Sequence, residues 1–378
     1  MQIEKFDFVF VLGSYPIYYP TRGDYIVFKL CEKLYEKGYR IGVFVMKPPH
    51  KWLGILGISD QYITIKLKLY SLLQNKLTCK YLFPILRYFR KTDYDYSFLR
   101  YTKVYFLSQP DGKFLVQNLI AAWWGTAYFV ADDSFNAENK YYLIQNEEND
   151  PTFSGSLHEY ASKSYELPLK KIVINETLAK RFKLNSSSKM RIGINLDLFK
   201  IINPINSRDR KKILFTLRVG KYKGAEYALE VISILHVKCP ELILVGFGNM
   251  HPNRIPDYVT YYYMPSRSDV CKLYNECSIF VSTFIVEGFS LMPLEAMACG
   301  ACVISSYNNG VVEYLKNDFN GLLVIPRDAA AIVTAVSSHI SDDNRRKKLV
   351  INGNLTAESY TYDNMVEDFL QAISNRTG

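Results

Sequence analysis

The feature that most constrains the fold is an alternation of short apolar runs with amphipathic stretches, which repeats along the chain. Residues 6–12 have the composition of a buried strand. Asp24 begins a stretch whose apolar residues have helical spacing, and Gly38 ends it. An apolar run follows at residues 41–46. A strand, a helix and a second strand in this order predict a parallel pair joined by a right-handed crossover.

The pattern continues through both halves of the chain. Residues 114–131 carry no charge and are predicted to divide into a helix over 114–124 and a strand over 126–131. The other predicted strands are residues 104–107, 142–145, 171–174, 212–217, 241–245, 259–264, 278–282, 301–305 and 322–325. Helices are predicted at residues 225–237, 268–277 and 292–299. These alternating elements indicate an α/β protein with parallel sheets.

The length of 378 residues indicates two domains of ordinary size. Residues 199–212 are polar, contain Pro and Asn, and form the best linker candidate. We therefore predict two doubly wound, Rossmann-like domains that face each other across a cleft. Ligands of open α/β sheets bind at the carboxyl ends of the strands, so the cleft is the expected site.

Composition excludes several classes of protein. With 48% hydrophobic and 22% charged residues, the chain is neither disordered nor fibrous. Seven cysteines without a zinc-like pattern indicate free thiols in a reducing compartment, and the C-x-x-C spacing of Cys299 and Cys302 falls at an expected helix-to-strand turn. No secretory signal is visible, and polar residues interrupt the uncharged stretch, so we expect a soluble, cytoplasmic protein.

Most of the net charge of +9 comes from one stretch of the chain. Residues 47–103 contain eleven basic and three acidic residues, interleaved with aromatic and aliphatic ones. One interpretation is a solvated face over buried aromatics; another is peripheral contact with anionic lipid headgroups at the inner membrane face. No nucleic-acid-binding motif accompanies the charge, so nucleic acid is not an expected partner.

Two carboxylates flank a predicted helix start in Glu287-Gly-Phe-Ser-Leu-Met-Pro-Leu-Glu295. The backbone amides of Phe289 to Met292 would be unpaired donors there, and the helix dipole favours an anion. A carboxylate can accept hydrogen bonds from two neighbouring sugar hydroxyls. The segment therefore suits a ligand with both phosphate and hydroxyl groups. Alternatively, Glu295 is only an acid favoured at a helix start.

Further charged residues follow predicted strands. Arg218 and Lys223 lie between a strand and a helix, where both could meet a diphosphate. The alternative is a solvated basic loop. Asp93-Tyr-Asp95 could hold a metal bridging a diphosphate, but a three-residue pattern arises easily by chance. We expect no metal site, and the five histidines form no cluster.

Together these segments resemble the retaining glycosyltransferases of family 4, which have the GT-B fold. The resemblance covers residues 190–372 and rests most firmly on Glu287-x7-Glu295 followed by Ala-Met-Ala-Cys-Gly300. The remaining matches are Gly193-Ile-Asn-Leu-Asp197-Leu-Phe199, Arg218 with Lys223-Gly224, Gly246-Phe-Gly248, Gly310-Val-Val-Glu313, Asn320-Gly-Leu-Leu and Tyr360-Thr-Tyr-Asp-Asn-Met.

The resemblance implies an acceptor-side domain over residues 1–200 and a nucleotide-sugar-binding domain over 201–360. Residues 361–378 would form a helix that returns to the first domain. The implied activity is hexosyl or deoxyhexosyl transfer with retention, without metal or other cofactor. The acceptor would be a hydroxyl of a glycan, or of a lipid-linked or protein-linked acceptor.

The resemblance also implies roles for single residues. Glu295 would hold the ribose, and Arg218 with Lys223 would neutralise the leaving diphosphate. Glu287 would be the third catalytic residue and would hold the transferred sugar and phosphate. The other implied donor-binding residues are Gly23, Met264, which would line the base, and Gly288, Phe289, Ser290 and Leu291.

The chain departs from the family pattern in three places. Arg22 and Leu217 stand where the family commonly has glycines. The usual histidine after a middle strand is absent, and Asn146, Glu147 and Glu148 become the acceptor or base candidates. Their surroundings resemble a rhamnosyltransferase-like branch. Rival interpretations are a nucleotide-sugar epimerase, a phosphorylase, or a non-catalytic nucleotide-sugar-binding protein on the same fold.

Overall fold

The computed structural model describes residues 3–13, 22–46, 102–107, 114–132, 135–150, 154–185 and 188–374. The chain divides into two compact units, Ile192–Asn364 and a first unit made of Met1–Arg191 with Met365–Gly378. The division falls before the polar segment 199–212, and that segment's last residues already belong to a strand. Each unit is a parallel α/β domain, as the alternating pattern predicts. The cleft expected between the domains stays a prediction.

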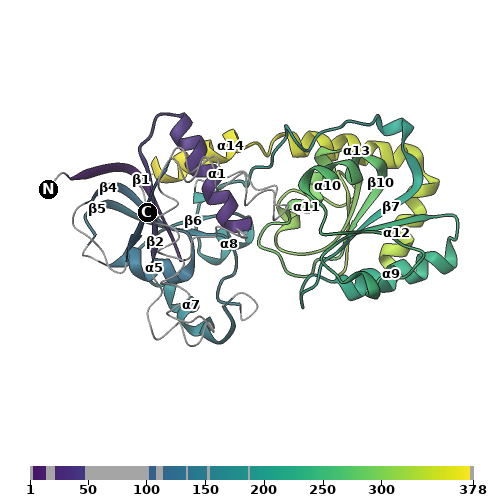
Figure 1. Cartoon of the computed structure of the whole chain (residues 1–378), viewed down its shortest axis with the longest axis horizontal. Coiled ribbons are helices and arrows are strands. Elements are labelled where there is room, and N and C mark those ends of the chain that lie inside the picture. The colour runs from purple at the N-terminus through teal and green to yellow at the C-terminus, as the bar shows by residue number, and fades with distance from the viewer. Residues whose placement is uncertain are drawn as a thin grey trace. The chain divides into compact units, whose positions relative to one another are not determined.

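The first unit contains a six-stranded parallel sheet in the order β3-β2-β1-β4-β5-β6 (Figure 1). Its strands are β1 (Glu4–Leu12), β2 (Ile41–Met46), β3 (Lys103–Leu107), β4 (Phe114–Ala121), β5 (Ala137–Ile144) and β6 (Lys170–Val173). The strand order reverses between β1 and β4, which pair over most of their length from Glu4 opposite Phe114 to Val11 opposite Ala121. In a doubly wound sheet this reversal is the topological switch point.

Helices cover both faces of the first sheet. Figure 1 shows α1 (Arg22–Glu36) and α14 (Tyr362–Ser374) on one face, and α5 (Trp124–Ala131) and α7 (His158–Ser164) on the other. The short helix α8 (Glu176–Arg181) follows β6. The end of the chain is held here because the Phe369 ring lies 5.9 and 5.7 Å from the rings of Phe8 and Phe10. Arg191 also pairs with Asp368 at 2.7 Å.

The second unit repeats this arrangement, with the strand order β12-β11-β10-β7-β8-β9. Its strands are β7 (Asp209–Leu217), β8 (Ile243–Gly248), β9 (Thr260–Tyr263), β10 (Cys277–Ser282), β11 (Cys302–Ser306) and β12 (Leu322–Val324). Its helices are α9 (Ala225–Lys238), α10 (Arg267–Glu276), α11 (Leu291–Ala298), α12 (Ala329–Ser341) and α13 (Asp343–Glu358). Figure 1 shows α9 and α12 on one face of the sheet and α10, α11 and α13 on the other. Short 3-10 turns lie at Gly155–Leu157, Ile205–Ser207, Pro252–Arg254 and Val311–Glu313.

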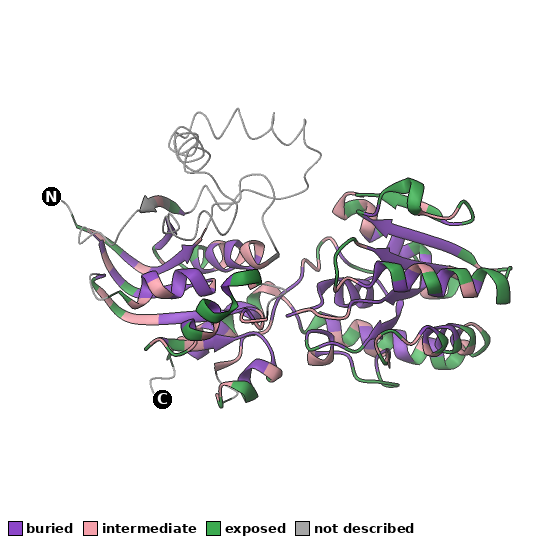
Figure 2. Cartoon of the chain, turned by 90° about the horizontal axis from the view of Figure 1, so that it is seen from below, coloured by how far each residue is buried: buried purple, intermediate pink, exposed green. Residues whose placement is uncertain are grey.

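The strands are buried on both faces, which explains why they are continuous apolar runs in the sequence. Every residue of β2, β10 and β11 is buried, and Figure 2 shows the interior strands of both sheets in the colour of burial. Most predicted strands and helices are confirmed within a few residues at each end. The largest differences are at β5, which begins five residues before the predicted start, at β7, which begins three residues before it, and at β8, which ends three residues after the predicted end.

The prediction for residues 114–131 is wrong, because the helix and the strand occur in the opposite order. Residues 114–121 form the strand β4, paired with β1 and β5, and residues 124–131 form the helix α5. An uncharged run buried on both sides has no polar face, so its periodicity does not separate strand from helix. None of the helices in the described ranges combines the length and the hydrophobicity that a membrane-spanning helix needs.

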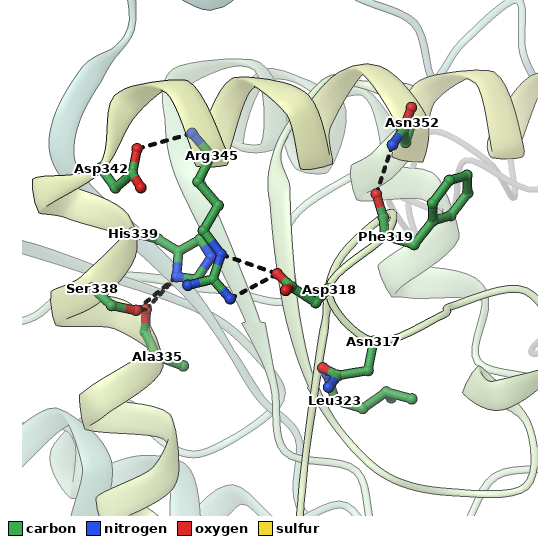
Figure 3. A network of polar contacts seen from close by, with 10 residues as sticks. All are labelled: Asn317, Asp318, Phe319, Leu323, Ala335, Ser338, His339, Asp342, Arg345 and Asn352. Atoms are coloured by element: carbon green, nitrogen blue, oxygen red, sulfur yellow. Dashed lines mark hydrogen bonds and ion pairs between the residues drawn. The ribbon is translucent and has the colours of Figure 1, made fainter.

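A polar network attaches the segment before β12 to α13, the second of the two helices that follow it (Figure 3). Arg345 of α13 donates to Asp318 Oδ1 from Nε at 3.0 Å and from Nη2 at 2.7 Å. Asn352 Nδ2 donates to the Phe319 carbonyl at 2.8 Å. Beside these contacts, the buried ring of His339 hydrogen-bonds to the Ala335 carbonyl on α12. The network holds the loop that leads into the motif Asn320-Gly-Leu-Leu.

Candidate functional site

The first part of the site is the start of α11, which follows β10 at the carboxyl edge of the second sheet. The helix begins at Leu291, and the side chain of its N-cap residue, Ser290, makes no capping hydrogen bond. The first N–H groups of a helix have no acceptor within the helix and carry the positive end of its dipole. This helix start can therefore receive an anion, as its sequence predicts.

Asn308 holds the loop before α11 in place. Its Oδ1 accepts hydrogen bonds from Ser290 Oγ at 3.0 Å and from the backbone N–H groups of Gly310 and Val311 at 3.0 and 2.9 Å. Its Nδ2 donates to the Phe284 carbonyl at 3.1 Å. Gly310 is required here because a Cβ at this position would lie 2.8 Å from Phe289 Cα. The amide-rich loop is therefore preorganised.

Lys223 and Glu287 meet at this edge although 64 positions separate them in the sequence. Lys223 Nζ lies 2.5 Å from Glu287 Oε1, and the side chains are 33% and 15% exposed. Gly224, which follows Lys223, has a positive φ of 66°, and a Cβ there would lie 2.0 Å from the Thr283 carbonyl oxygen. Only glycine allows this close approach of the loop after β7 to the loop after β10.

Arg218 directly follows β7 and is half-buried at the same edge of the sheet. Gly248 ends the neighbouring strand β8, and a Cβ there would lie 2.0 Å from the Leu217 carbonyl oxygen. Met264 follows β9, is 59% exposed, and donates its N–H to the Gly248 carbonyl at 2.7 Å. The structure thus places these residues at the ends of three adjacent strands.

Glu295 is almost completely buried in α11 and pairs with an arginine that the sequence analysis missed. Arg267 Nη2 donates to Glu295 Oε1 at 3.1 Å, with the two side chains 27% and 4% exposed. The Arg267 guanidinium also lies 5.0 Å from the centre of the Phe199 ring. A signal was present, because a basic residue in the first turn of a helix opposes the dipole. An acidic side chain nearby offsets this unfavourable interaction.

A hollow of about 580 Å³ opens beside Lys223, at the start of α9. Its lining combines charged side chains of both signs with apolar side chains. The lining residues are Val219, Gly220, Lys221, Gly224, Ala225, Glu226, Tyr227, Glu230, Ile285 and Arg327.

The first unit holds the acceptor and base candidates at the carboxyl end of β5. Glu147 pairs with Arg181 at 3.6 Å, and Asn146 is half-buried. Glu148 differs from both, because it is buried and accepts a short hydrogen bond from the Tyr142 hydroxyl. Burial raises the pKa of the Glu148 carboxyl to about 8, against the hydrogen bonds from Tyr142 and the Trp124 N–H. These contacts suit Glu148 to anchor the loop after β5.

Gly23 is the second residue of α1 and is half-buried. A Cβ at Gly23 would lie 3.2 Å from Gln145 Oε1, so the start of α1 is close to the loop after β5. Arg22 begins the same helix. These positions belong to the first unit, whereas the other predicted donor-binding residues belong to the second.

Other candidates from the sequence are placed apart or lie outside the described residues. Asp93-Tyr-Asp95 and the basic residues 47–101 fall outside them. Within the described ranges, no group of three His, Cys, Asp or Glu side chains could hold a metal ion. Cys299 and Cys302 are buried free thiols, and the Cys299 sulfur lies 3.9 Å from the Cys271 sulfur.

Comparison with known proteins agrees with this geometry. Residues 199–356 match the family model described as "Glycosyl transferases group 1", so the chain contains a domain of this type. That range includes Arg218, Lys223, Glu287 and Glu295. The resemblance seen in the sequence is therefore confirmed at the level of group 1 glycosyltransferases.

Two curated relatives are glycosyltransferases. An uncharacterized glycosyltransferase of Methanocaldococcus jannaschii is 27% identical over 57% of this chain and 57% of its own length. The N,N'-diacetylbacillosaminyl-diphospho-undecaprenol alpha-1,3-N-acetylgalactosaminyltransferase of Campylobacter jejuni is 28% identical over 48% of this chain and 52% of its own length. The chain thus spans little more than half the length of these relatives.

A solved structure matches over almost the whole chain. Anabaena HepE, in complex with UDP and glucose, covers 98% of this chain and 100% of its own, with a TM-score of 0.65 and 12% identity. At this identity the likeness concerns the fold. The predicted fold of two Rossmann-like α/β domains, as in GT-B glycosyltransferases, is confirmed.

Proposed function

We propose that this protein is a retaining glycosyltransferase of family 4 that uses a nucleotide-sugar donor and needs no metal ion. The observation that carries the proposal is the Lys223–Glu287 pair beside the start of α11, with Glu295 buried in that helix. The pair provides a cation and an acid close to amide donors, and the helix provides a carboxylate. A nucleoside diphosphate sugar requires these groups for its diphosphate and its hydroxyls.

Each group has a defined task in the proposed reaction. Arg218, Lys223 and the amides of Gly288–Leu291 bind the diphosphate. Glu287 holds the transferred sugar, Glu295 accepts from the ribose hydroxyls, and Met264 lies against the base. The bond between the anomeric carbon and the phosphate oxygen breaks, and the acceptor hydroxyl bonds to that carbon from the same face. The hydroxyl proton passes to the departing phosphate oxygen. Lys223 stabilises the negative charge that develops there.

The proposal for the acceptor rests on residues of the first unit and on the name of a relative. The Campylobacter jejuni enzyme is named for a diphospho-undecaprenol-linked sugar, which supports a lipid-linked glycan acceptor for this chain as well. Asn146 and Glu147, at the end of β5, are the residues proposed to orient the acceptor hydroxyl. Peripheral contact through residues 47–103 at the cytoplasmic membrane face would suit such an acceptor. A rhamnosyltransferase-like specificity remains part of the proposal.

The proposal is tested by nucleotide release from the donor, with Lys223→Ala as the decisive variant. Loss of one preorganised donor should lower kcat about a hundredfold, because the transition state loses a charge partner. Lys212→Ala is the matched control, since Lys212 forms a similar ion pair with Glu276 at 2.6 Å in the same unit. Near-normal turnover by Lys223→Ala would remove the site assignment. Turnover without an acceptor to a donor epimer would instead indicate an epimerase, and a requirement for inorganic phosphate would indicate a phosphorylase.

A further inference from the structure

A tryptophan stands at the topological switch point of the first sheet. Trp123 lies two residues after β4, and Gly13 directly follows the neighbouring strand β1. These are the two strands between which the order of the sheet reverses. Ligands of doubly wound sheets bind outside the carboxyl ends of the strands at this point. The Trp123 side chain is half-buried, whereas the adjacent Trp124 is only 1% exposed.

Two glycines leave room for the Trp123 ring. A Cβ on Gly13 would lie 2.5 Å from ring atom Cε3, and a Cβ on Gly125 would lie 2.3 Å from ring atom Cζ3. Any larger residue at either position would displace the ring. Glycine at positions 13 and 125 is therefore what allows the ring to lie where it does.

The backbone of Trp123 is also fixed. Thr126 Oγ1 accepts from the Trp123 N–H at 3.2 Å and donates to the Trp123 carbonyl at 2.8 Å. The same carbonyl accepts from the N–H groups of Thr126 and Ala127 at 2.9 and 3.1 Å. Thr126 itself is fully buried. The backbone is thus fixed, and the ring packs at 4.7 Å from the ring of Trp124, so ordering this side chain should cost a ligand little conformational entropy.

The loop that holds the acceptor candidates touches the same segment. Gln145 Nε2 donates to the Ala122 carbonyl at 3.4 Å, and the Glu148 carboxyl accepts from the Trp124 N–H. Asn146 and Glu147 lie between these two anchoring residues. A rigid aromatic ring and a set of hydroxyl-binding groups are therefore neighbours at one edge of the sheet.

We propose that Trp123 is the surface on which a sugar ring of the acceptor stacks, so that the acceptor is a glycan and not a bare lipid or peptide hydroxyl. This inference rests on the proposed function, which assigns the nucleotide to the second unit and leaves this edge to the acceptor. A pyranose has an apolar C–H face and a polar rim of hydroxyls. The aromatic ring suits the face, and Asn146 and Glu147 suit the rim. A hydrocarbon chain would need no polar groups beside the ring.

The test uses methyl α- and β-glycosides of glucose, galactose, N-acetylglucosamine and rhamnose as acceptor mimics. In the full-length protein with donor, at least one glycoside should accelerate nucleotide release. Trp123→Ala should raise the glycoside concentration for half-maximal acceleration about tenfold. Trp123→Phe should restore most of the loss, because it keeps an aromatic face.

Gly125→Ala tests whether the position of the Trp123 ring matters, and not only its presence. It keeps Trp123 but places a methyl group where the ring now lies, so it should weaken glycoside use as Trp123→Ala does. Tyr128→Ala is the matched control: it removes an aromatic ring from the same helix, α5, whose hydroxyl bonds to the Tyr160 carbonyl at 2.8 Å. Tyr128→Ala should leave the half-maximal concentration unchanged.

A second measurement does not depend on turnover. Titration with the glycosides should change the tryptophan emission of the unmodified protein, and Trp123→Ala should abolish that change. If nucleotide release fails while this emission change occurs, the proposed function is wrong and the sugar site stands. The inference is overturned if Trp123→Ala and Gly125→Ala leave both readouts unchanged, or if farnesyl diphosphate and no glycoside produces them.

Discussion

Two acid–base pairs define the candidate donor site at the scale of single residues. The sequence predicted both carboxylates and Lys223, because helix-start chemistry and strand ends are local signals. It did not predict that Lys223 would pair with Glu287, nor that Arg267 would pair with Glu295. Such pairs depend on loops that approach from different strands. The close approach of Gly224 to Thr283 brings Lys223 to Glu287, and no local sequence pattern predicts that approach.

Arg267 should act on donor affinity more than on chemistry. Arg267→Met would leave the Glu295 carboxylate buried and without this charged hydrogen bond, whose usual worth is about 1.5–3 kcal/mol. The dissociation constant for the donor should rise about 10- to 100-fold, with a smaller change in kcat. Isothermal titration with the donor measures the first quantity, and single-turnover kinetics the second.

The control for Arg267 is Arg254→Met in the same unit. Arg254 pairs with Glu226 at 2.6 Å, and both side chains are at least half exposed, so its loss should change donor affinity little. Arg267→Lys should recover part of the affinity because it keeps the charge. Equal donor affinities in Arg267→Met and the unmodified protein would show that Glu295 is held by its helix alone.

At the scale of helices and strands, the sequence predicts most elements because buried parallel strands are short, apolar and separated by amphipathic helices. The exception is the segment of β4 and α5. Both elements are uncharged and largely buried, so neither shows a polar face that would reveal its period. Residues 114–121 form a strand because they pair with β1 on one side and β5 on the other, and these contacts are tertiary.

His339 makes the stability of the second unit depend on pH. The ring is 1% exposed, and its Nε2 has no partner among the described residues. Burial lowers the pKa of His339 below 6.5, and nearby Arg345 lowers it further. The hydrogen bond to the Ala335 carbonyl and the carboxylates of Asp318 and Asp342 act in the opposite direction (Figure 3). Protonation would place a proton on Nε2 in a buried environment that offers no acceptor.

The expected effect has a definite sign. Because the folded-state pKa is depressed, the unfolded chain binds the proton first as the pH falls. The contribution of His339 should therefore be complete above about pH 6.5 and be lost below it, with a slope of at most about 1.4 kcal/mol per pH unit. Urea unfolding at pH 8 and pH 5.5, compared with His339→Leu, measures this loss. If both proteins lose the same stability between these pH values, His339 is not responsible.

The whole molecule repeats one architecture. Both sheets have the same order when numbered within their unit, and in both the site candidates lie at the carboxyl ends of the strands. This duplication could be predicted because the strand–helix alternation occurs twice. The acceptor side could be predicted less well. Trp123, the residue proposed to stack on the acceptor, follows a strand that was predicted as a helix. The position of its ring depends on Gly13, which is far from it in the sequence.

We propose that the second unit binds a nucleoside diphosphate sugar through Lys223, Glu287, Glu295 and the start of α11. A thermal-shift screen of the full-length protein against nucleotide sugars with different bases and sugars tests it most directly. At one hundred times its dissociation constant, the correct donor should add about 2.7 kcal/mol of stability. The rise in melting temperature should be lost in Glu295→Ala and retained in Lys212→Ala. The claim is contradicted if no nucleotide sugar raises the melting temperature, or if the rise persists unchanged in Glu295→Ala.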